Sequence, residues 1–212
     1  MRTLIPILIA VLLAACGGPT SVELDPTPEI TAENTFAIQQ DRSEARFIID
    51  EVLRGDPTTV VGATDDVTGT LVVDYADPAA ASIGLIRINA TTLATDIDLR
   101  NRALQGQILQ TGEPENQVIT FEQTAVEGLP AEPVTLGESI PLTITGMLTV
   151  HGETNEVTFE GSATPTDGST IEGTFSTTIQ YADYGISIPD VPQVAEVSDD
   201  VTLEIDFVAT TP

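Results

Sequence analysis

Residues 140–163 read IPLTITGMLTVHGETNEVTFEGSA, and this stretch decides the fold class. On both sides of His151-Gly152, apolar and small residues occupy every second position, which is the period of a half-buried β-strand. The alternating residues are Ile140, Leu142, Ile144, Gly146, Leu148 and Val150, and then Val157, Phe159, Gly161 and Ala163. The stretch therefore predicts two long antiparallel strands joined by a tight turn at 151–153.

The same two-residue period recurs along the rest of the chain, which is rich in threonine and valine, residues that favour strands. It predicts further strands near residues 36–38, 45–49, 67–75, 82–90, 119–123, 171–179 and 201–207. With the first pair, these make about eight or nine strands at hairpin spacing, which favours a β-sandwich or a closed antiparallel barrel.

One segment breaks this rhythm. Thr95 and Asp98 have the spacing of a capping box, in which Thr95 is the N-cap of a helix. Apolar residues then recur at helical spacing, at Ile97, Leu104 and Ile108. We therefore expect one sizeable helix over residues 96–110.

The interior of such a barrel is the first place to look for a binding site. A barrel of about eight strands either fills with side chains or holds one small ligand. Its inward positions here include small residues, namely Gly69, Gly84, Gly146, Gly161, Ala163 and Gly173. These small residues either leave room inside or mark bulges and tight curvature, and the period alone leaves both interpretations open.

The first sixteen residues are typical of an exported lipoprotein. Met1-Arg2 gives a positive start, and residues 4–15 form an apolar run too short for a spanning helix, which needs about 20 residues. The run ends in Leu13-Ala14-Ala15-Cys16-Gly17, which resembles the bacterial lipobox, where the cysteine is acylated and the chain is cut before it. The alternative is a buried strand with an incidental cysteine.

We therefore expect three parts along the chain. Residues 1–15 form the lipoprotein signal peptide, and residues 16–34 are the acylated Cys16 with a flexible tether rich in Gly, Pro, Thr and acids. The folded domain spans residues 35–212. Cys16 is the only cysteine, so an internal disulfide is excluded.

The charge is strongly negative, with 7 basic and 33 acidic residues and a formal net charge of −26. Removal of residues 1–15 takes one arginine away, so six remain and the charge becomes 6 − 33 = −27. This excludes a nucleic-acid binder, which needs a basic footprint. It also argues against adsorption to anionic lipids, which needs Lys/Arg clusters. A calcium site is the alternative use of the acids, but no D-x-[DN]-x-[DN]-G loop occurs.

Catalytic and metal motifs are poorly represented. The single histidine, His151, falls in the predicted hairpin turn, where a turn role is favoured over a catalytic or ligand role. No G-x-S-x-G motif frames a serine and no phosphate-binding loop occurs. A metal site is not expected either, because a site of His and Cys ligands needs more than one of these residues and only His151 remains once Cys16 is acylated. We therefore expect no enzyme activity and no cofactor.

Several stretches together resemble the YceI-like, polyisoprenoid-binding family. The most specific is residues 144–157, ITGMLTVHGETNEV, which is similar to the family pattern G-x-L-T-x-H-G-x-T-x-x-V. Residues 95–104, TDIDLRNRAL, followed by VITF at 118–121, resemble T-x-n-x-x-R-D-x-H-L and P-x-I-T-F. Near the end, DYGI at 183–186 and VSDDV at 197–201 resemble D-F-G-I and V-S-D-E-V.

The resemblance implies an all-β fold, an extended eight-stranded antiparallel lipocalin-like barrel with the helix at about 96–110 inserted. It implies non-catalytic binding or transport of an amphiphilic isoprenoid lipid, quinone-like or polyprenyl, in an apolar channel outside the cytoplasm. The chain departs from the family at Asn101 (for Asp), Ala103 (for His), Ile108-Leu109 (for aromatics) and Tyr181-Ala182 (for an arginine). Because few cations remain for a pyrophosphate, a neutral, quinone-like head group fits this charge better.

The predicted ligand-binding residues are the apolar side chains on the inward faces of the strands. They are Phe47, Ile49, Leu71, Val73, Ile86, Ile88, Phe121, Leu148, Val150, Phe159, Phe175, Ile179 and Phe207. For each of these residues the alternative role is ordinary packing in the core. If the predicted register of a strand were wrong by one residue, the residues adjacent to those named would face inward in their place.

Two other functions stay open at this point. The acidic exterior and the tether also suit a cell-surface protein that binds another protein or a polysaccharide, and such a protein needs no lipid cavity. A hydrolase that uses carboxylates would need two acids in a cleft with raised pKa values.

The expected location is the outer face of the cytoplasmic membrane, or the periplasm or outer membrane, with attachment through the acyl group on Cys16. The expected partners are the isoprenoid lipid and that membrane, with no nucleic acid. The family resemblance also allows a dimer.

Overall fold

A computed structural model of the protein describes residues 34–212. The expected signal peptide, Cys16 and all of the tether except Asn34 lie outside the described residues. The strands are β1 (Thr35–Ile38), β2 (Glu44–Leu53), β3 (Asp56–Thr64), β4 (Val67–Thr68), β5 (Thr70–Val72), β6 (Ser82–Ile83), β7 (Ile86–Asn89), β8 (Val118–Glu127), β9 (Ile140–Val150), β10 (Glu153–Asp167), β11 (Thr170–Gln180), β12 (Val194–Val197) and β13 (Asp200–Thr210).

The helical elements are short. They are η1 (Gln40–Arg42), η2 (Pro78–Ala80), η3 (Ala90–Thr92), α1 (Asp98–Ala103), the π-helical η4 (Leu104–Ile108), η5 (Pro114–Asn116) and η6 (Tyr181–Tyr184). Within residues 34–212, no helix is long and apolar enough to cross a membrane.

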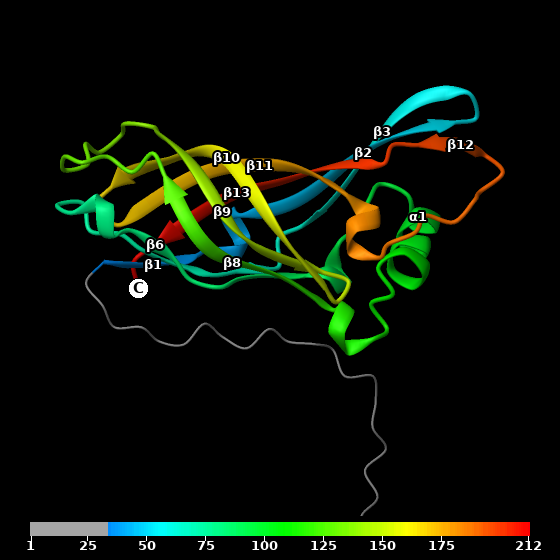
Figure 1. Ribbon diagram of the computed structural model, residues 1–212, viewed down its shortest axis with the longest axis horizontal. Helices are drawn as coiled ribbons and strands as arrows, with labels where there is room; N and C mark the ends of the chain where they lie inside the picture. The colour runs from blue at the N-terminus through cyan, green and yellow to red at the C-terminus, as the bar shows by residue number, and fades with distance from the viewer. Residues whose placement is uncertain (1–33) are drawn as a thin grey trace, which may run out of the picture.

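The strands form an antiparallel meander that returns to its start (Figure 1). Three groups of consecutive strands, β1–β2, β3–β5 and β6–β7, are each divided only by short bends. When each group is counted as one segment, the barrel wall consists of eight segments. Each segment pairs with the next, and β13 pairs with β11 on one side and with β1 and β2 on the other. The predicted all-β, eight-stranded lipocalin-like barrel is therefore confirmed.

The hairpin predicted over residues 140–163 forms as expected. β9 and β10 pair from Val150 with Glu153 to Ile140 with Ala163, and His151 and Gly152 have φ angles of 52° and 78°. Positive φ at both central residues is the type I′ geometry that matches the twist of the flanking strands. His151 is thus a turn residue, and its Nδ1 lies 3.3 Å from the carbonyl oxygen of Tyr184.

Two strands escape the sequence prediction. β3 begins Asp56-Pro57, which reads as a turn, and its apolar residues are sparse. β3 pairs with no named strand of the described chain other than β2, so its other edge is free. Proline is tolerated on such an edge, because its missing N–H would have had no partner strand there. β12 adds to the other side of β2, so the β2–β3 hairpin extends past the barrel next to α1 (Figure 1).

The predicted helix over 96–110 is shorter than expected and is not capped by Thr95. Its α-helical part begins at Asp98 with Ile97 as N-cap, and from Leu104 it continues as a π-helix. Thr95 donates hydrogen bonds to Asn101 Oδ1 from its backbone N–H, at 2.7 Å, and from its Oγ1, at 2.8 Å. The Thr95 N–H, which a capping box would pair with Asp98, is therefore bonded to Asn101, and Thr95 Oγ1 accepts from the N–H of Ile97 at 3.4 Å, so the capping-box prediction is wrong.

The small inward residues do not simply leave the interior empty. A Cβ at Gly146 would lie 2.5 Å from Phe121 Cζ, and a Cβ at Gly173 would lie 2.6 Å from Phe207 Cε1. Phenylalanine rings on the adjacent strands therefore lie over these glycines and narrow the barrel there. The Phe121 ring also packs edge-to-face on that of Phe159 at 5.3 Å.

Candidate ligand cavity

The barrel contains a cavity of about 830 Å³ that is open to solvent. Its lining comes from every one of the eight segments, from the α1–η4 region and from the chain before β12, and most of it is aliphatic or aromatic. Pockets that hold small organic ligands have volumes of about 300–1,000 Å³. The cavity therefore has the size and the apolar character of a site for a single small lipid.

The structure brings all the predicted ligand-binding residues together on this lining. They are Phe47, Ile49, Leu71, Val73, Ile86, Ile88, Phe121, Leu148, Val150, Phe159, Phe175, Ile179 and Phe207. Some are also part of the core, because Leu148 and Phe175 are 3% and 4% exposed. Their position follows from the two-residue period, while a role in ligand binding stays a prediction.

Another part of the lining escapes the sequence prediction. Within the described chain it comes from short helices, loops and β12, and its members include Leu93, Ala103, Leu104, Leu109, Leu129, Val134, Ile186, Ile188, Val191, Val194 and Val197. Leu93, Leu104 and Leu109 also pack with Ala90 in a small core of their own. The helical spacing of Leu104 and Ile108 is the one sequence signal for this region.

We call the end of the cavity bounded by residues 51–54, 97–100 and 191–194 the mouth. Three contacts hold it together. Arg100 on α1 bonds Glu51 on β2, β2 pairs with β12 at Leu53 and Val194, and the backbone N–H of Arg54 donates to the carbonyl of Gln193 at 2.7 Å. The mouth thus joins parts of the chain that are far apart in sequence.

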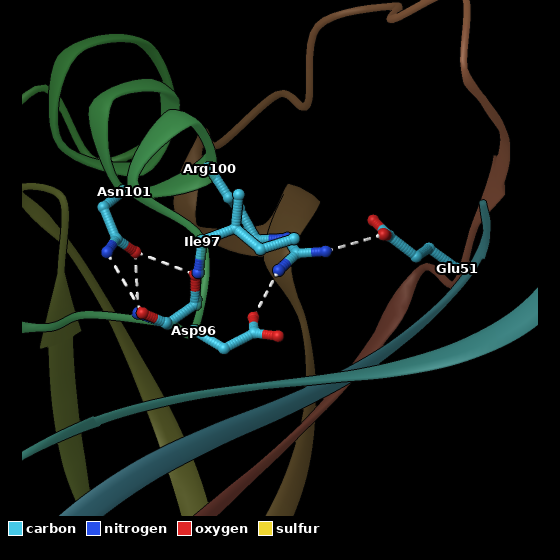
Figure 2. A network of polar contacts seen from close by, with 6 residues as sticks. Glu51, Asp96, Ile97, Arg100 and Asn101 are labelled. Atoms are coloured by element: carbon cyan, nitrogen blue, oxygen red, sulfur yellow. Dashed lines mark hydrogen bonds and ion pairs between the residues drawn. The ribbon is translucent and has the colours of Figure 1, made fainter. Parts of the chain in front are cut away.

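Arg100 is the centre of the polar network at the mouth (Figure 2). Its Nη2 donates to Glu51 Oε1 at 3.0 Å and its Nη1 donates to Asp96 Oδ1 at 2.7 Å. The side chains of Arg100 and Glu51 are only 19% and 11% exposed, whereas Asp96 is open to solvent. The positive charge is therefore already matched by two carboxylates, of which one is mostly buried.

Asn101, where the family pattern has aspartate, keeps the loop before α1 closed. In addition to the two bonds it accepts from Thr95, its Nδ2 donates to the Thr95 carbonyl oxygen at 3.1 Å (Figure 2). An amide can accept and donate at the same site, while an ionised carboxylate can only accept. The substitution therefore preserves the loop and removes one negative charge.

A second arginine cluster lies on β2 and β13. Arg46 forms ion pairs with Glu44 at 2.9 Å, Glu204 at 3.0 Å and Asp206 at 2.6 Å. The hydrogen bond to Glu44, and those to Asp206 and Glu204, raise the pKa of Arg46 well above its ordinary value. A hydrogen bond from Thr174 and the ion pair with Arg46 lower the pKa of Asp206.

Two tyrosines on the lining carry neutral hydroxyls. Burial, and then the charge of Asp167, raises the pKa of Tyr75, whose hydroxyl donates to the Asp167 carbonyl oxygen at 3.4 Å. Burial, and then Asp199, raises the pKa of Tyr181. Both phenols therefore stay protonated at neutral pH and add hydrogen-bonding capacity without charge.

The cavity does not have the features of a catalytic or metal centre. Its two acidic lining residues, Glu51 and Glu204, each pair with an arginine, and His151 does not line it. Across residues 34–212, no group of three or more His, Cys, Asp or Glu is placed to hold a metal ion.

Comparison with known proteins agrees with this architecture. The family model described as the YceI-like domain matches residues 36–209. A search of curated proteins finds no match.

Solved structures share the fold at low sequence identity. A polyisoprenoid binding domain from Saccharophagus degradans, implicated in plant cell wall breakdown, has a TM-score of 0.66 and 15% identity over 84% of this chain and 98% of that one. BcnA from Burkholderia cenocepacia has a TM-score of 0.61 and 20% identity over 82% and 99%. A YceI protein from Campylobacter jejuni has a TM-score of 0.54 and 18% identity over 69% and 82%.

Proposed function

The chain belongs to the YceI-like domain family, and we propose that it binds one amphiphilic isoprenoid lipid in the barrel cavity without catalysing a reaction. The observation that carries this proposal is the apolar cavity of about 830 Å³, which draws its lining from the whole length of the barrel. Burial of each CH₂ group contributes about 0.8 kcal/mol, so a prenyl chain of modest length gives ample binding energy. The name of the Saccharophagus degradans domain, which has the same fold, is in line with such a ligand.

We further propose that the head group is neutral and quinone-like. Of the three arginines on the lining, Arg46 and Arg100 are engaged by carboxylates within 3.0 Å, which leaves the exposed Arg54 as the one lining arginine of the described chain without an ion pair. A pyrophosphate bound to Arg100 would have to displace its carboxylates and would leave the mostly buried Glu51 unpaired, which is costly, and Arg54 alone offers a single positive charge. A carbonyl or hydroxyl head needs only a hydrogen bond, which a spare N–H of Arg100 or a tyrosine hydroxyl can donate.

The proposed location is outside the cytoplasm, with attachment to a membrane through acylated Cys16. The support is the signal-like sequence of residues 1–17 alone. Cys16→Ala should leave the protein at its precursor mass and release it from lipid modification, as cell fractionation and mass spectrometry will report. A variant with the same mass and the same fractionation as the wild type would contradict the anchor.

The binding proposal is tested by native mass spectrometry of protein extracted gently from its own membranes, together with titration of a fluorescent prenyl quinone. We expect a bound lipid in the wild type. Ile88→Trp, which places a large ring on the lining, should lower the affinity at least tenfold, about 1.4 kcal/mol.

Arg87→Trp is the matched control, because Arg87 is the exposed neighbour of Ile88 on β7 and does not line the cavity. It should bind like the wild type. A consistently empty wild-type barrel, or equal affinities for both tryptophan variants, would contradict the proposal. The alternative of a surface protein that binds a protein or polysaccharide needs no cavity, so the observed cavity does not support it.

A further inference from the structure

Exposed apolar side chains gather at the mouth of the cavity. The described chain has seven large exposed hydrophobic residues, and three of them also line the cavity: Ile97 at 41%, Leu99 at 71% and Val191 at 41% exposed. All three belong to the mouth. The four that do not line the cavity are Val61, Val72, Leu85 and Leu136.

These side chains come from two different parts of the chain. Ile97 and Leu99 lie at the start of α1, and Val191 lies in the chain just before β12. Ile97 lies beside Arg100 in Figure 2. The apolar lining thus continues out of the barrel and forms a rim in water.

We infer that this rim, Ile97, Leu99 and Val191, docks on the surface of a neutral lipid bilayer, so that the ligand moves between membrane and cavity without crossing water. The inference rests on the proposed lipid-binding function. Each CH₂ group costs about 0.8 kcal/mol to expose, so ten of them oppose passage through water by about 8 kcal/mol. Contact between the rim and the acyl region removes this cost.

A bilayer fits the rim better than a second copy of the chain. A stable protein interface buries about 800 Å² on each partner, and three side chains supply only a small part of that area. Two copies with a formal charge of −26 each would also repel one another. Interfacial insertion, in contrast, needs only a few apolar side chains at the level of the head groups.

The charges around the mouth select the type of bilayer. Arg54 and Arg102 are exposed there, and Arg100 is neutralised by Glu51 and Asp96. The nearby chain also carries the acids Asp56, Asp98, Asp190 and Glu196. The acids outnumber the arginines, so anionic lipids are repelled, and zwitterionic phosphatidylcholine is the better surface.

The placement of the rim is compatible with the proposed anchor. β1 begins at the end of the barrel opposite α1, next to the C-terminus (Figure 1). An acyl chain on Cys16 would therefore attach the domain by the far end and leave the rim free to meet a bilayer.

The chain contains no tryptophan, which makes a site-specific test possible. In the full chain, Leu99→Trp places a single fluorophore on the rim, and Val191→Trp places one on its other side. With phosphatidylcholine vesicles, both should shift their emission to shorter wavelength and lose intensity to brominated phosphatidylcholine. Leu136→Trp is the control, because Leu136 is 50% exposed in the loop between β8 and β9 and does not line the cavity.

Three results would overturn the inference. They are equal responses of rim and control tryptophans, a response that needs anionic vesicles, and a blue shift without vesicles that grows with protein concentration, which would indicate a second copy on the rim. Because the N-terminal segment is the same in all variants, its own membrane binding cancels in the comparison.

A second measurement separates this inference from the proposed function. The full chain loaded with the fluorescent prenyl quinone is mixed with phosphatidylcholine vesicles, and the rate of transfer is recorded. Ile97→Ser/Leu99→Ser should lower the transfer rate several-fold, by a larger factor than it lowers the equilibrium affinity, and Leu136→Ser should change neither quantity. A wild type that binds no quinone contradicts the proposed function, whereas the tryptophan responses still decide whether the rim meets a bilayer.

Discussion

The channel inside the barrel and the mouth at its end belong to one cavity, but they are specified in different ways. In the channel, every second residue of a strand faces inward, so the strand periodicity is enough to find the lining. At the mouth, the end of β2, the start of α1 and the segment that leads into β12 contribute three side chains each. The difference teaches that a site is readable from sequence where regular structure repeats it, and not where long-range contacts assemble it.

The two regions also differ in what holds them. The channel wall is a continuous ladder of backbone hydrogen bonds with apolar residues packed across it. The mouth depends on a small separate core around Leu104 and on the Arg100–Glu51 ion pair. Regions with few buried contacts open locally at lower free energy than the core, so we expect the mouth to open before the channel wall.

The largest loss of stability is expected from adding a side chain at a tightly packed glycine in the channel wall. A Cβ at Gly161 would collide with the carbonyl oxygen of Thr174 and lie 2.7 Å from Phe175 Cα, so the backbone itself must move. Gly161→Val should lower the free energy of unfolding by about 3 kcal/mol or more, at the upper end of the overpacking range. Gly168→Val is the control, since nothing lies within 4 Å of a Cβ there. Similar urea midpoints for the two variants would contradict the tight wall.

Truncation in the small core beside the mouth should cost somewhat less and act locally. Leu104 is 6% exposed in the small core, and Leu104→Ala should destabilise by about 2 kcal/mol, the low end of the range for buried leucines. Hydrogen exchange should accelerate in residues 98–109 and stay unchanged in β9 and β10. The matched change in the channel, Leu148→Ala, should instead lower the protection of the whole barrel, and a global effect of Leu104→Ala would show that the regions are not separable.

The ion pair that bridges the mouth should contribute a smaller amount. Arg100→Gln leaves the mostly buried carboxylate of Glu51 without its partner, and we expect a loss of about 1–2 kcal/mol. A double-mutant cycle with Glu51→Gln, followed by urea unfolding, should give a coupling of about 1 kcal/mol. The exposed Arg42–Glu172 pair, at 49% and 48% exposure, should give about 0.5 kcal/mol or less. Equal coupling energies for the Arg100–Glu51 and Arg42–Glu172 pairs would contradict the larger contribution of the Arg100 pair to stability.

The smallest effect concerns pH and the wall of the channel. The pKa of Asp206 is lowered in the folded state, first by the hydrogen bond from Thr174 and then by Arg46. Its carboxylate therefore stabilises the fold above the unfolded pKa of about 3.9, and this contribution is lost as the pH falls through the lower folded pKa.

Asp206→Asn should flatten the acid side of the stability–pH curve by less than about 1 kcal/mol, because Asp206 is 42% exposed and solvent screens its ion pair. Asp200→Asn, on the same strand, is the control. Parallel acid limbs for the wild type and Asp206→Asn would contradict this role of the Arg46 cluster.

The chain's sequence determined the barrel, its longest hairpin and the whole predicted lining. A period of two over many residues is a strong and local signal, because adjacent side chains of a strand must point to opposite faces. The I′ turn at His151-Gly152 then sets the register of β9 and β10, and the register decides which residues face inward.

The tertiary structure alone decided the start of α1, the existence of β3 and β12 and the assembly of the mouth. The capping box does not form, because the Thr95 N–H bonds Asn101, six residues on, and the helix begins after Ile97. Pro57 fits a strand because that edge is unpaired. Arg100 meets Glu51 across 49 positions of sequence. Such contacts depend on where the folded barrel brings distant segments, and no local pattern of residues encodes that placement.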